Sequence, residues 1–216
     1  MSKDIESETS GIGGADLPEH GKVRWRRFAA AMVTAVAAAF GLLVLTAQGA
    51  VAVQFSVSGM PFTVAADRLD GTGFEQFATL DLMVPNSPNE GTTGGYLVLV
   101  VSAIHEATLT NLCQTVSLGG EYLKITAGDN GTPVTATNLV VDGDEITAGD
   151  AQFTNINIGQ DASTLNEVPG VVGNAGVFAQ QADNVTLTNL RQNNYATTAA
   201  AFRLPGLHLS FTKDGC

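Results

Sequence analysis

Histidine, serine and aspartate side chains are the candidates for catalysis in this chain. Beyond residue 53 there are two histidines, His105 and His208, and seven serines. A serine hydrolase needs a serine beside a base beside an orienting acid. His208 is the leading base candidate, because it alternates along a strand with Leu207 and Leu209, which we expect to face the core. The G-x-S-x-G motif of α/β-hydrolases does not occur in the sequence.

The spacing of the acidic residues and cysteines predicts no metal and no cofactor. Asp142, Asp144 and Glu145 form one acidic cluster, and Asp129-Asn130-Gly131 forms another. Neither has the spacing of an EF-hand, so solvated turns are the favoured interpretation. The two cysteines are too few for a four-thiolate zinc site. A glycine-rich phosphate loop with a lysine is also missing.

The charge balance excludes nucleic acid as a partner. The chain has 216 residues and a formal net charge of −11 at pH 7. Residues 53–216 hold 5 basic and 16 acidic residues, so they carry the whole acidic excess. Phosphate backbones need clustered lysine and arginine, and an acidic domain offers the opposite.

The first 52 residues have the layout of an export signal. Residues 1–27 are polar and end in four basic residues, which predicts a disordered leader with a basic end. Residues 28–52 contain an uncharged run followed by Ala50-Val51-Ala52, the pattern of an apolar region before a cleavage site. The run is long enough that an uncleaved membrane anchor is the alternative. In both cases residues 53–216 form a secreted or extracytoplasmic domain.

Export predicts a disulfide between Cys113 and Cys216. They are the only cysteines in the chain, and an oxidising compartment favours their pairing. The bond would attach the C-terminus to the domain.

From Val53 onward the sequence predicts strands and turns, hence an all-β domain. Runs rich in Val, Ile, Leu, Thr and Phe are bounded by pairs such as Asp70-Gly71 and Asp142-Gly143, which are typical of turns. The predicted strands are residues 54–58, 74–84, 96–104, 107–118, 122–127, 134–141, 151–158, 177–190 and 200–211.

An internal repeat reduces the number of all-β architectures that fit the sequence. The pentapeptide Ile125–Asp129 recurs at Ile146–Asp150, and a Thr-Asn-[Leu/Ile] core occurs four times, with asparagines at 111, 138, 155 and 189. Repeats of this size favour a β-solenoid or a strongly curved sheet, with an asparagine at an equivalent corner of each unit. A β-sandwich, in which the matches reflect only strand-end chemistry, is the alternative.

Several segments carry a resemblance to a known family. They are FSVSG at 55–59, AADRLDGTG at 65–73, GQDASTL at 159–165, AAAFRLPGLHL at 199–209, and the terminal cysteine. The chain resembles a family of secreted actinobacterial proteins of poorly defined function, several of which are labelled cholesterol esterase. The resemblance implies a sterol-ester hydrolase. Ser163, within the matching segment and close to Asp161, is then the candidate nucleophile.

Three classes of function follow from these observations. The first is a sterol-ester hydrolase that uses His208, Ser163 and Asp161. The second is a non-catalytic protein that binds apolar lipid or a sterol ester on the inner face of a curved sheet. The third is a structural protein of the cell envelope. Residues 28–52 would add a membrane contact if they are not removed.

Overall fold

The computed structural model describes Trp25, Met32 and residues 56–216. The chain divides into two compact units, Met1–Leu43 and Val44–Cys216. In the first unit the two described residues are helical and exposed. Apart from Trp25 and Met32, the predicted leader 1–27 and the apolar segment 28–52 lie outside the described residues. Among the described residues there is no helix with the length and apolar character that crossing a bilayer requires.

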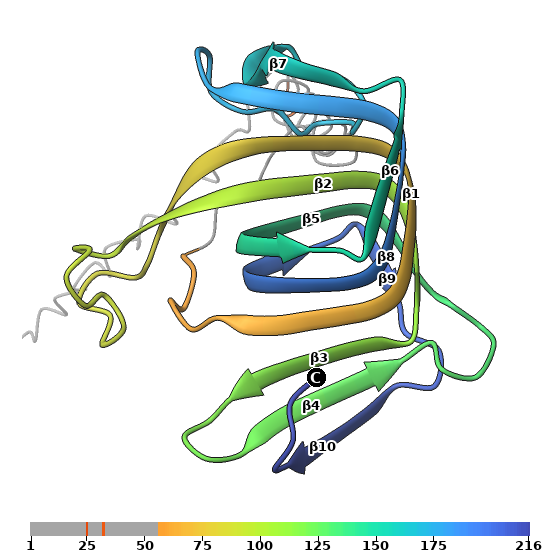
Figure 1. Cartoon of the computed structure of the whole chain (residues 1–216). Helices are drawn as coiled ribbons and strands as arrows, with labels where there is room; N and C mark the ends of the chain where they lie inside the picture. Colours follow the sequence, from red (N-terminus) through yellow and green to blue (C-terminus); the bar gives the residue numbers. More distant parts are fainter. Residues whose placement is uncertain (1–24, 26–31, 33–55) are drawn as a thin grey trace, which may run out of the picture. The chain divides into compact units, whose positions relative to one another are not determined.

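The second unit is a ten-stranded antiparallel sheet with one short 3-10 helix (Figure 1). Its strands are β1 (Phe62–Leu82), β2 (Tyr96–Thr110), β3 (Leu112–Ser117), β4 (Tyr122–Ala127), β5 (Val134–Thr147), β6 (Asp150–Thr154), β7 (Asn157–Asp161), β8 (Phe178–Thr198), β9 (Ala201–Arg203) and β10 (His208–Thr212). The helix η1 spans Ala162–Thr164. The predicted all-β class is confirmed.

The strand order is β10-β4-β3-β1-β2-β5-β8-β6, with β7 on β8 and β9 on β5. The long strand β1 also pairs with β8. Stacked solenoid coils would make neighbouring strands parallel, whereas every pairing between these strands is antiparallel. The strongly curved sheet is therefore the architecture observed, and the long strands bend together (Figure 1).

The bends fall in two rows of residues that run across the strands. Thr72 pairs with Glu106 and Phe74 with Ile104, so Gly73 lies opposite His105. Continuing the register in the same way gives two corner rows. The first row is Asn155, Asp183, Gly73, His105 and Asn138, and the second is Gly149, Asn189, Asp67, Asn111 and Gly128.

The four repeat asparagines all occupy these corner rows. Asn111, Asn138, Asn155 and Asn189 have φ between 46° and 55°, in the left-handed region that asparagine tolerates better than most residues. The predicted equivalence of their positions is confirmed. Three of these asparagines contact a side chain on the neighbouring strand. Asn111 donates to Asp67 at 2.5 Å and Asn155 to Asp183 at 2.6 Å, while Asn138 contacts His105 Nδ1 at 2.7 Å.

We expect the left-handed backbone to make Asn111 costly to replace. Asn111→Ala should lower the free energy of unfolding by about 1–2 kcal/mol, and Asn111→Gly by less, because glycine adopts this conformation freely. Asn193→Ala is a matched control, since it removes a similar amide–carboxylate hydrogen bond, to Asp144, at a residue without a positive φ. Urea denaturation of the three variants measures the differences. Equal losses for Asn111→Ala and Asn111→Gly would contradict the expectation.

The corner rows divide the long strands into straight parts, which we call facets, and the facets pack around one hydrophobic core. Leu69, Phe74, Leu109, Leu139 and Leu187 belong to a single buried cluster drawn from β1, β2, β5 and β8. A second cluster lies where residues 162–177 cover the sheet. It contains Phe77, Val101, Ala162, Leu165 and Ala179.

Two predicted turns are wrong, because Asp70-Gly71 and Asp142-Gly143 lie inside β1 and β5. Packing explains Gly71: a Cβ there would lie 2.5 Å from Ile104 Cγ2. The glycine therefore serves a close approach within the core rather than a change of chain direction.

The predicted disulfide is present. Cys113 on β3 is bonded to Cys216, 103 residues away in sequence. The C-terminal residue is held further by the Arg191 guanidinium, which donates to its carbonyl oxygen at 2.8 Å.

Candidate functional site

Ser163 and Asp161 lie in a local turn and are hydrogen-bonded to each other. The Ser163 hydroxyl donates to Asp161 Oδ1 at 2.7 Å, and its backbone N–H donates to the same oxygen at 2.9 Å. Asp161 Oδ2 also accepts the N–H of Gly176 at 2.7 Å. These hydrogen bonds hold the pKa of Asp161 below its usual range. Asp161 thus caps η1 and fastens the segment that follows it.

His208 lies far along the sheet from that turn. It is exposed on β10, the end strand that pairs only with β4, whereas β7 and η1 lie beyond β8 (Figure 1). The structure does not bring His208 together with Ser163 and Asp161. Leu207 and Leu209 were expected to be buried against the core, and this is wrong: they are 55% and 56% exposed. The register places Leu209 in the same row as the buried Val64, on the core side of the sheet, but β10 is the end strand of the sheet and has a neighbouring strand on one side only.

The second histidine also lacks a serine partner. His105 sits in the first corner row, where its Nδ1 contacts Asn138 Oδ1. In the part of the chain that the structure describes, no three His, Cys, Asp or Glu residues are placed to hold a metal ion. The Asp144 carboxylate of the predicted acidic cluster instead accepts hydrogen bonds from Asn193 and Tyr195.

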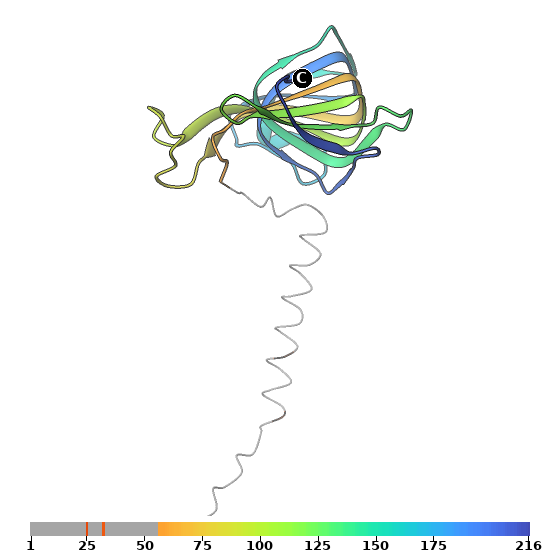
Figure 2. The same ribbon diagram turned by 90° about the horizontal axis from the view of Figure 1, so that it is seen from below.

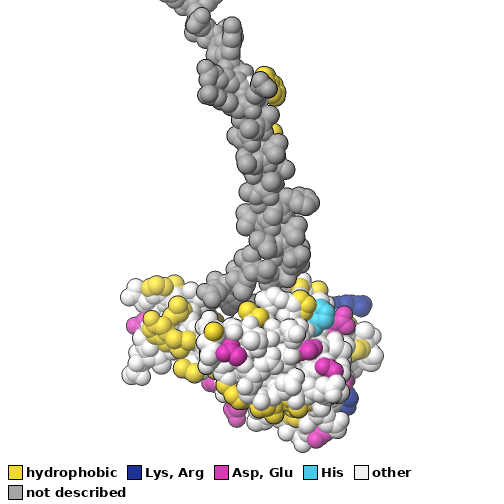
Figure 3. Space-filling view, turned by 90° about the horizontal axis from the view of Figure 1, so that it is seen from above, with side chains coloured by type: hydrophobic (Ala, Val, Ile, Leu, Met, Phe, Trp, Pro, Cys, Tyr) yellow, Lys and Arg dark blue, Asp and Glu magenta, His cyan; other side chains and the backbone are white. Residues whose placement is uncertain are grey.

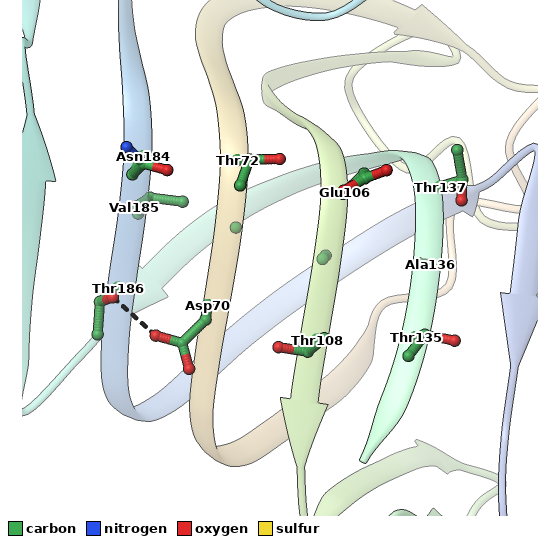
Figure 4. A pocket seen from close by; sticks show the side chains of 12 residues that line it. Asp70, Thr72, Glu106, Thr108, Thr135, Ala136, Thr137, Asn184, Val185 and Thr186 are labelled. Atoms are coloured by element: carbon green, nitrogen blue, oxygen red, sulfur yellow. Dashed lines mark hydrogen bonds between the residues drawn. The ribbon is translucent and has the colours of Figure 1, made fainter.

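A polar groove of about 460 Å³ lies on the outer face of the sheet, between the two corner rows (Figure 4). Its floor is the backbone of Gly71, Ala107 and Ala136, whose own positions face the core. Two rows of outward side chains cross it from β8 through β1 and β2 to β5. One row is Asn184, Thr72, Glu106 and Thr137, and the other is Thr186, Asp70, Thr108 and Thr135.

One corner of the polar groove is fixed by an ion pair. Arg68 donates two hydrogen bonds of 2.6 Å to the Asp70 carboxylate, which also accepts the Thr186 hydroxyl at 2.8 Å. The Arg68 guanidinium lowers the pKa of Asp70, so this carboxylate is charged at neutral pH. The groove therefore carries negative charge and a set of hydroxyl groups.

An apolar surface lies on the hairpin formed by the end of β1 and the start of β2. This hairpin projects beyond the other strands (Figure 1, Figure 2). Leu80 pairs with Val98 and Leu82 with Tyr96, so their side chains share one face. We call this surface the ribbon face, and it consists of Leu80, Leu82, Val84, Tyr96, Val98 and Val100, all exposed, with Val98 at 76%.

The other side of the hairpin is packed. Met83 is buried in a small cluster with Val57 and Ala196, and Leu97 packs against them. The hairpin is thus held to the domain by one face and presents the other to its surroundings. Hydrophobic side chains gather on this projecting part in the space-filling view (Figure 3).

The β-sheet that carries these surfaces coincides with a matched region of sequence. Residues 58–216 match the family of unknown function DUF6230. The chain belongs to this family. The matched region includes all ten strands and both cysteines. Comparison with curated proteins and with solved structures found no match in either case.

The candidate residues of both surfaces were missed in the sequence, although a signal for each is present. For the polar groove, the signal is a pattern of threonines at alternate positions, as in Thr108-x-Thr110, Thr135-x-Thr137 and Thr186-x-Thr188. Residues of one strand two apart share a face, so repeated pairs on adjacent strands build a hydroxyl array. The ribbon face was hidden because residues 96–100 are apolar on both faces, a pattern that does not tell an exposed side from a buried one.

Proposed function

We propose that the protein is a non-catalytic, extracytoplasmic protein that binds neutral lipid through the ribbon face. The observation that carries the proposal is the run of six exposed apolar side chains on one side of a projecting hairpin. The surface of a soluble protein seldom exposes a contiguous apolar patch of this kind unless a binding partner covers it. An apolar lipid or a sterol ester, the partner expected from the resemblance, would cover it.

Charge selects the kind of lipid. Between residues 78 and 100 the charged residues are Asp81 and Glu90, and lysine and arginine are absent. The domain as a whole is acidic, so anionic headgroups would repel it. Burying a Val or Leu side chain contributes roughly 1.5–3 kcal/mol to the free energy of binding. Several such side chains together would suffice to hold the hairpin on a lipid surface. Tyr96 suits the boundary, since its ring is apolar and its hydroxyl can stay in water.

The Cys113–Cys216 disulfide is consistent with an extracytoplasmic location. Secretion after cleavage near residue 52, or anchoring through residues 28–52, are the two forms of this location that we propose. N-terminal sequencing of the exported protein separates them.

A fluorescent reporter on the ribbon face tests lipid binding in the full chain. Residues 53–216 contain no tryptophan, so Tyr96→Trp with Trp25→Phe gives a single reporter. We expect vesicles of phosphatidylcholine with cholesteryl ester to shift its emission to the blue and protect it from acrylamide. A reporter at Phe211, an exposed aromatic residue on β10, should stay quenchable.

Polar substitutions complete this test. Adding Leu82→Ser and Val98→Ser should weaken vesicle binding by more than tenfold, because both side chains would lose their apolar burial. Leu207→Ser with Leu209→Ser is the matched control on another exposed apolar strand. Equal protection of both reporters, or equal loss in the two pairs of variants, would contradict the proposal.

Sterol-ester hydrolysis is the activity implied by the resemblance, and it stays a proposal of second rank. The non-catalytic proposal expects no release of fatty acid from a sterol ester above a blank by the purified chain. If the wild type hydrolyses the ester, and His208→Gln or Ser163→Ala abolishes this activity, the non-catalytic proposal is wrong and the protein is a hydrolase.

A further inference from the structure

We infer that the polar groove between the corner rows is a binding site for a neutral, hydroxyl-rich glycan. The site lies on the middle facet of β8, β1, β2 and β5, apart from the β1–β2 hairpin that carries the ribbon face. It is independent of the proposed lipid binding, since its lining combines hydroxyl, amide and carboxylate groups with threonine methyl groups and small residues, and it holds no large apolar side chain (Figure 4).

Most polar side chains of the groove are free to take a ligand. Thr72, Thr108, Thr135, Glu106 and Asn184 make no hydrogen bond to another described side chain or backbone group, in contrast to the fixed Asp70–Thr186 pair. Each hydroxyl can donate once and accept twice, and each carboxylate oxygen accepts. The groove thus offers both donors and acceptors, as the hydroxyl groups of a sugar require.

The sheet holds these groups in a regular array. Neighbouring strands lie about 4.8 Å apart, and residues i and i+2 of one strand lie about 6.7 Å apart. Four strands therefore present two parallel rows of polar groups at fixed intervals. A chain of repeating sugar units laid across the strands can hydrogen-bond to successive members of a row, whereas a single small polar molecule would use only one or two.

Charge and composition restrict the ligand further. Lys, Arg and His are missing from the lining itself, the Asp70 carboxylate is paired with the adjacent Arg68, and Glu106 is a second acidic residue whose carboxylate has no ion pair with a described residue. An anionic polymer would be repelled, so uronic-acid glycans, phosphate-bearing polymers and nucleic acids do not fit. No aromatic ring lines the groove, so ring stacking adds nothing and affinity rests on hydrogen bonds along the chain.

Backbone amide NMR titration of the full chain tests the site. The probes are tetramers of N-acetylglucosamine and of glucose, both neutral, with polygalacturonate oligomers as the anionic comparison. We expect saturable shifts with at least one neutral probe at millimolar concentration, centred on residues 70–72, 106–108, 135–137 and 184–186. The anionic probe should leave these signals unchanged. Absence of saturable shifts with both neutral probes, or shifts centred elsewhere, would overturn the inference.

Variants distinguish binding through the threonine hydroxyl groups from non-specific binding to the surface. Thr108→Val with Thr135→Val removes two hydroxyls at nearly constant shape and should weaken binding at least tenfold, while Thr108→Ser with Thr135→Ser should retain it. Thr198→Val is the matched control, an exposed strand threonine outside the groove. Unchanged binding in the double valine variant, or an equal loss in Thr198→Val, would also overturn the inference.

Discussion

Reduction of the Cys113–Cys216 disulfide is expected to lower the free energy of unfolding by about 4–5 kcal/mol, because the bond closes a loop of about a hundred residues in the unfolded chain. The folded state gives a second reason. Among the described strands β10 pairs with β4 alone, and its apolar side chains are exposed, so apart from a few exposed polar contacts the disulfide is what joins the C-terminal residues to the sheet. The loss should therefore be among the largest available from a single chemical change.

Urea denaturation with and without reductant measures this effect. The double variant Cys113→Ser, Cys216→Ser should match the reduced wild type and be insensitive to reductant. Arg191→Gln, which removes the hydrogen bond to the Cys216 carbonyl and leaves the disulfide, should cost far less. A difference under about 1 kcal/mol between oxidised and reduced wild type would show that the unfolded-chain argument fails here.

The stability of the domain is expected to fall as the pH rises from 5 to 8, because Glu75 and Asp142 both have a raised pKa in the folded state. The Glu75 side chain is fully buried beneath residues 162–177, where Oε1 accepts the N–H of Val168 at 2.8 Å and Oε2 accepts no hydrogen bond from a described residue. Burial raises the pKa of Glu75 from 4.5 to about 7. The folded state therefore holds a proton that the unfolded chain has already released between these two values.

The sign of the effect follows from this difference. The contribution of Glu75 is fully present below pH 4.5 and is lost as the pH rises through about 7, by about 3 kcal/mol at most. Glu75→Gln keeps the acceptor for Val168 without a charge, so it should remove this part of the pH dependence and be more stable than the wild type at pH 8. Denaturation midpoints between pH 4 and pH 9 measure both changes.

Two controls sharpen this prediction. Burial, with the neighbouring Asp81, also raises the pKa of Asp142 to about 7, so Asp142→Asn should remove a further part of the slope. Glu106→Gln, an exposed residue of the polar groove, should leave the profile unchanged. A Glu75→Gln profile that runs parallel to the wild type would show that Glu75 does not cause the fall.

The sequence was sufficient for the class of fold and for the corners, and insufficient for the length of the strands. β4 was predicted with its observed bounds, because glycines flank a short apolar run. The repeated asparagines marked the bends, since few residues accept a left-handed backbone. The pair Asp70-Gly71 led to a wrong turn prediction, because the sequence does not distinguish a glycine needed for close packing from one needed for a turn. Of the predicted strand 54–58, residues 56–58 are described, and there Val57 forms an isolated bridge with Met83.

The candidate sites could be predicted less well than the fold. Ser163 with Asp161 is equally typical of a helix cap and of a nucleophile with its acid, and only the register places His208 at the far end of the sheet. The burial of Glu75 depends on a covering segment about ninety residues later, which no local pattern reveals. Both surfaces that we assign depend on which of two strand faces stays uncovered, and that is decided by tertiary pairing.

The pairing of β1 with β8 has a consequence for how the chain reaches its final state. β1 is the first strand to be synthesised, yet the residues that pair with it along Phe62–Phe77 come more than a hundred positions later. Contacts so distant in sequence form slowly, because a long loop must close before they add any stability. The central strand therefore lacks the partners along one of its edges until residues 179–194 have been made. If the chain is exported as we propose, this order of events would delay completion of the sheet until nearly the whole domain has crossed the membrane.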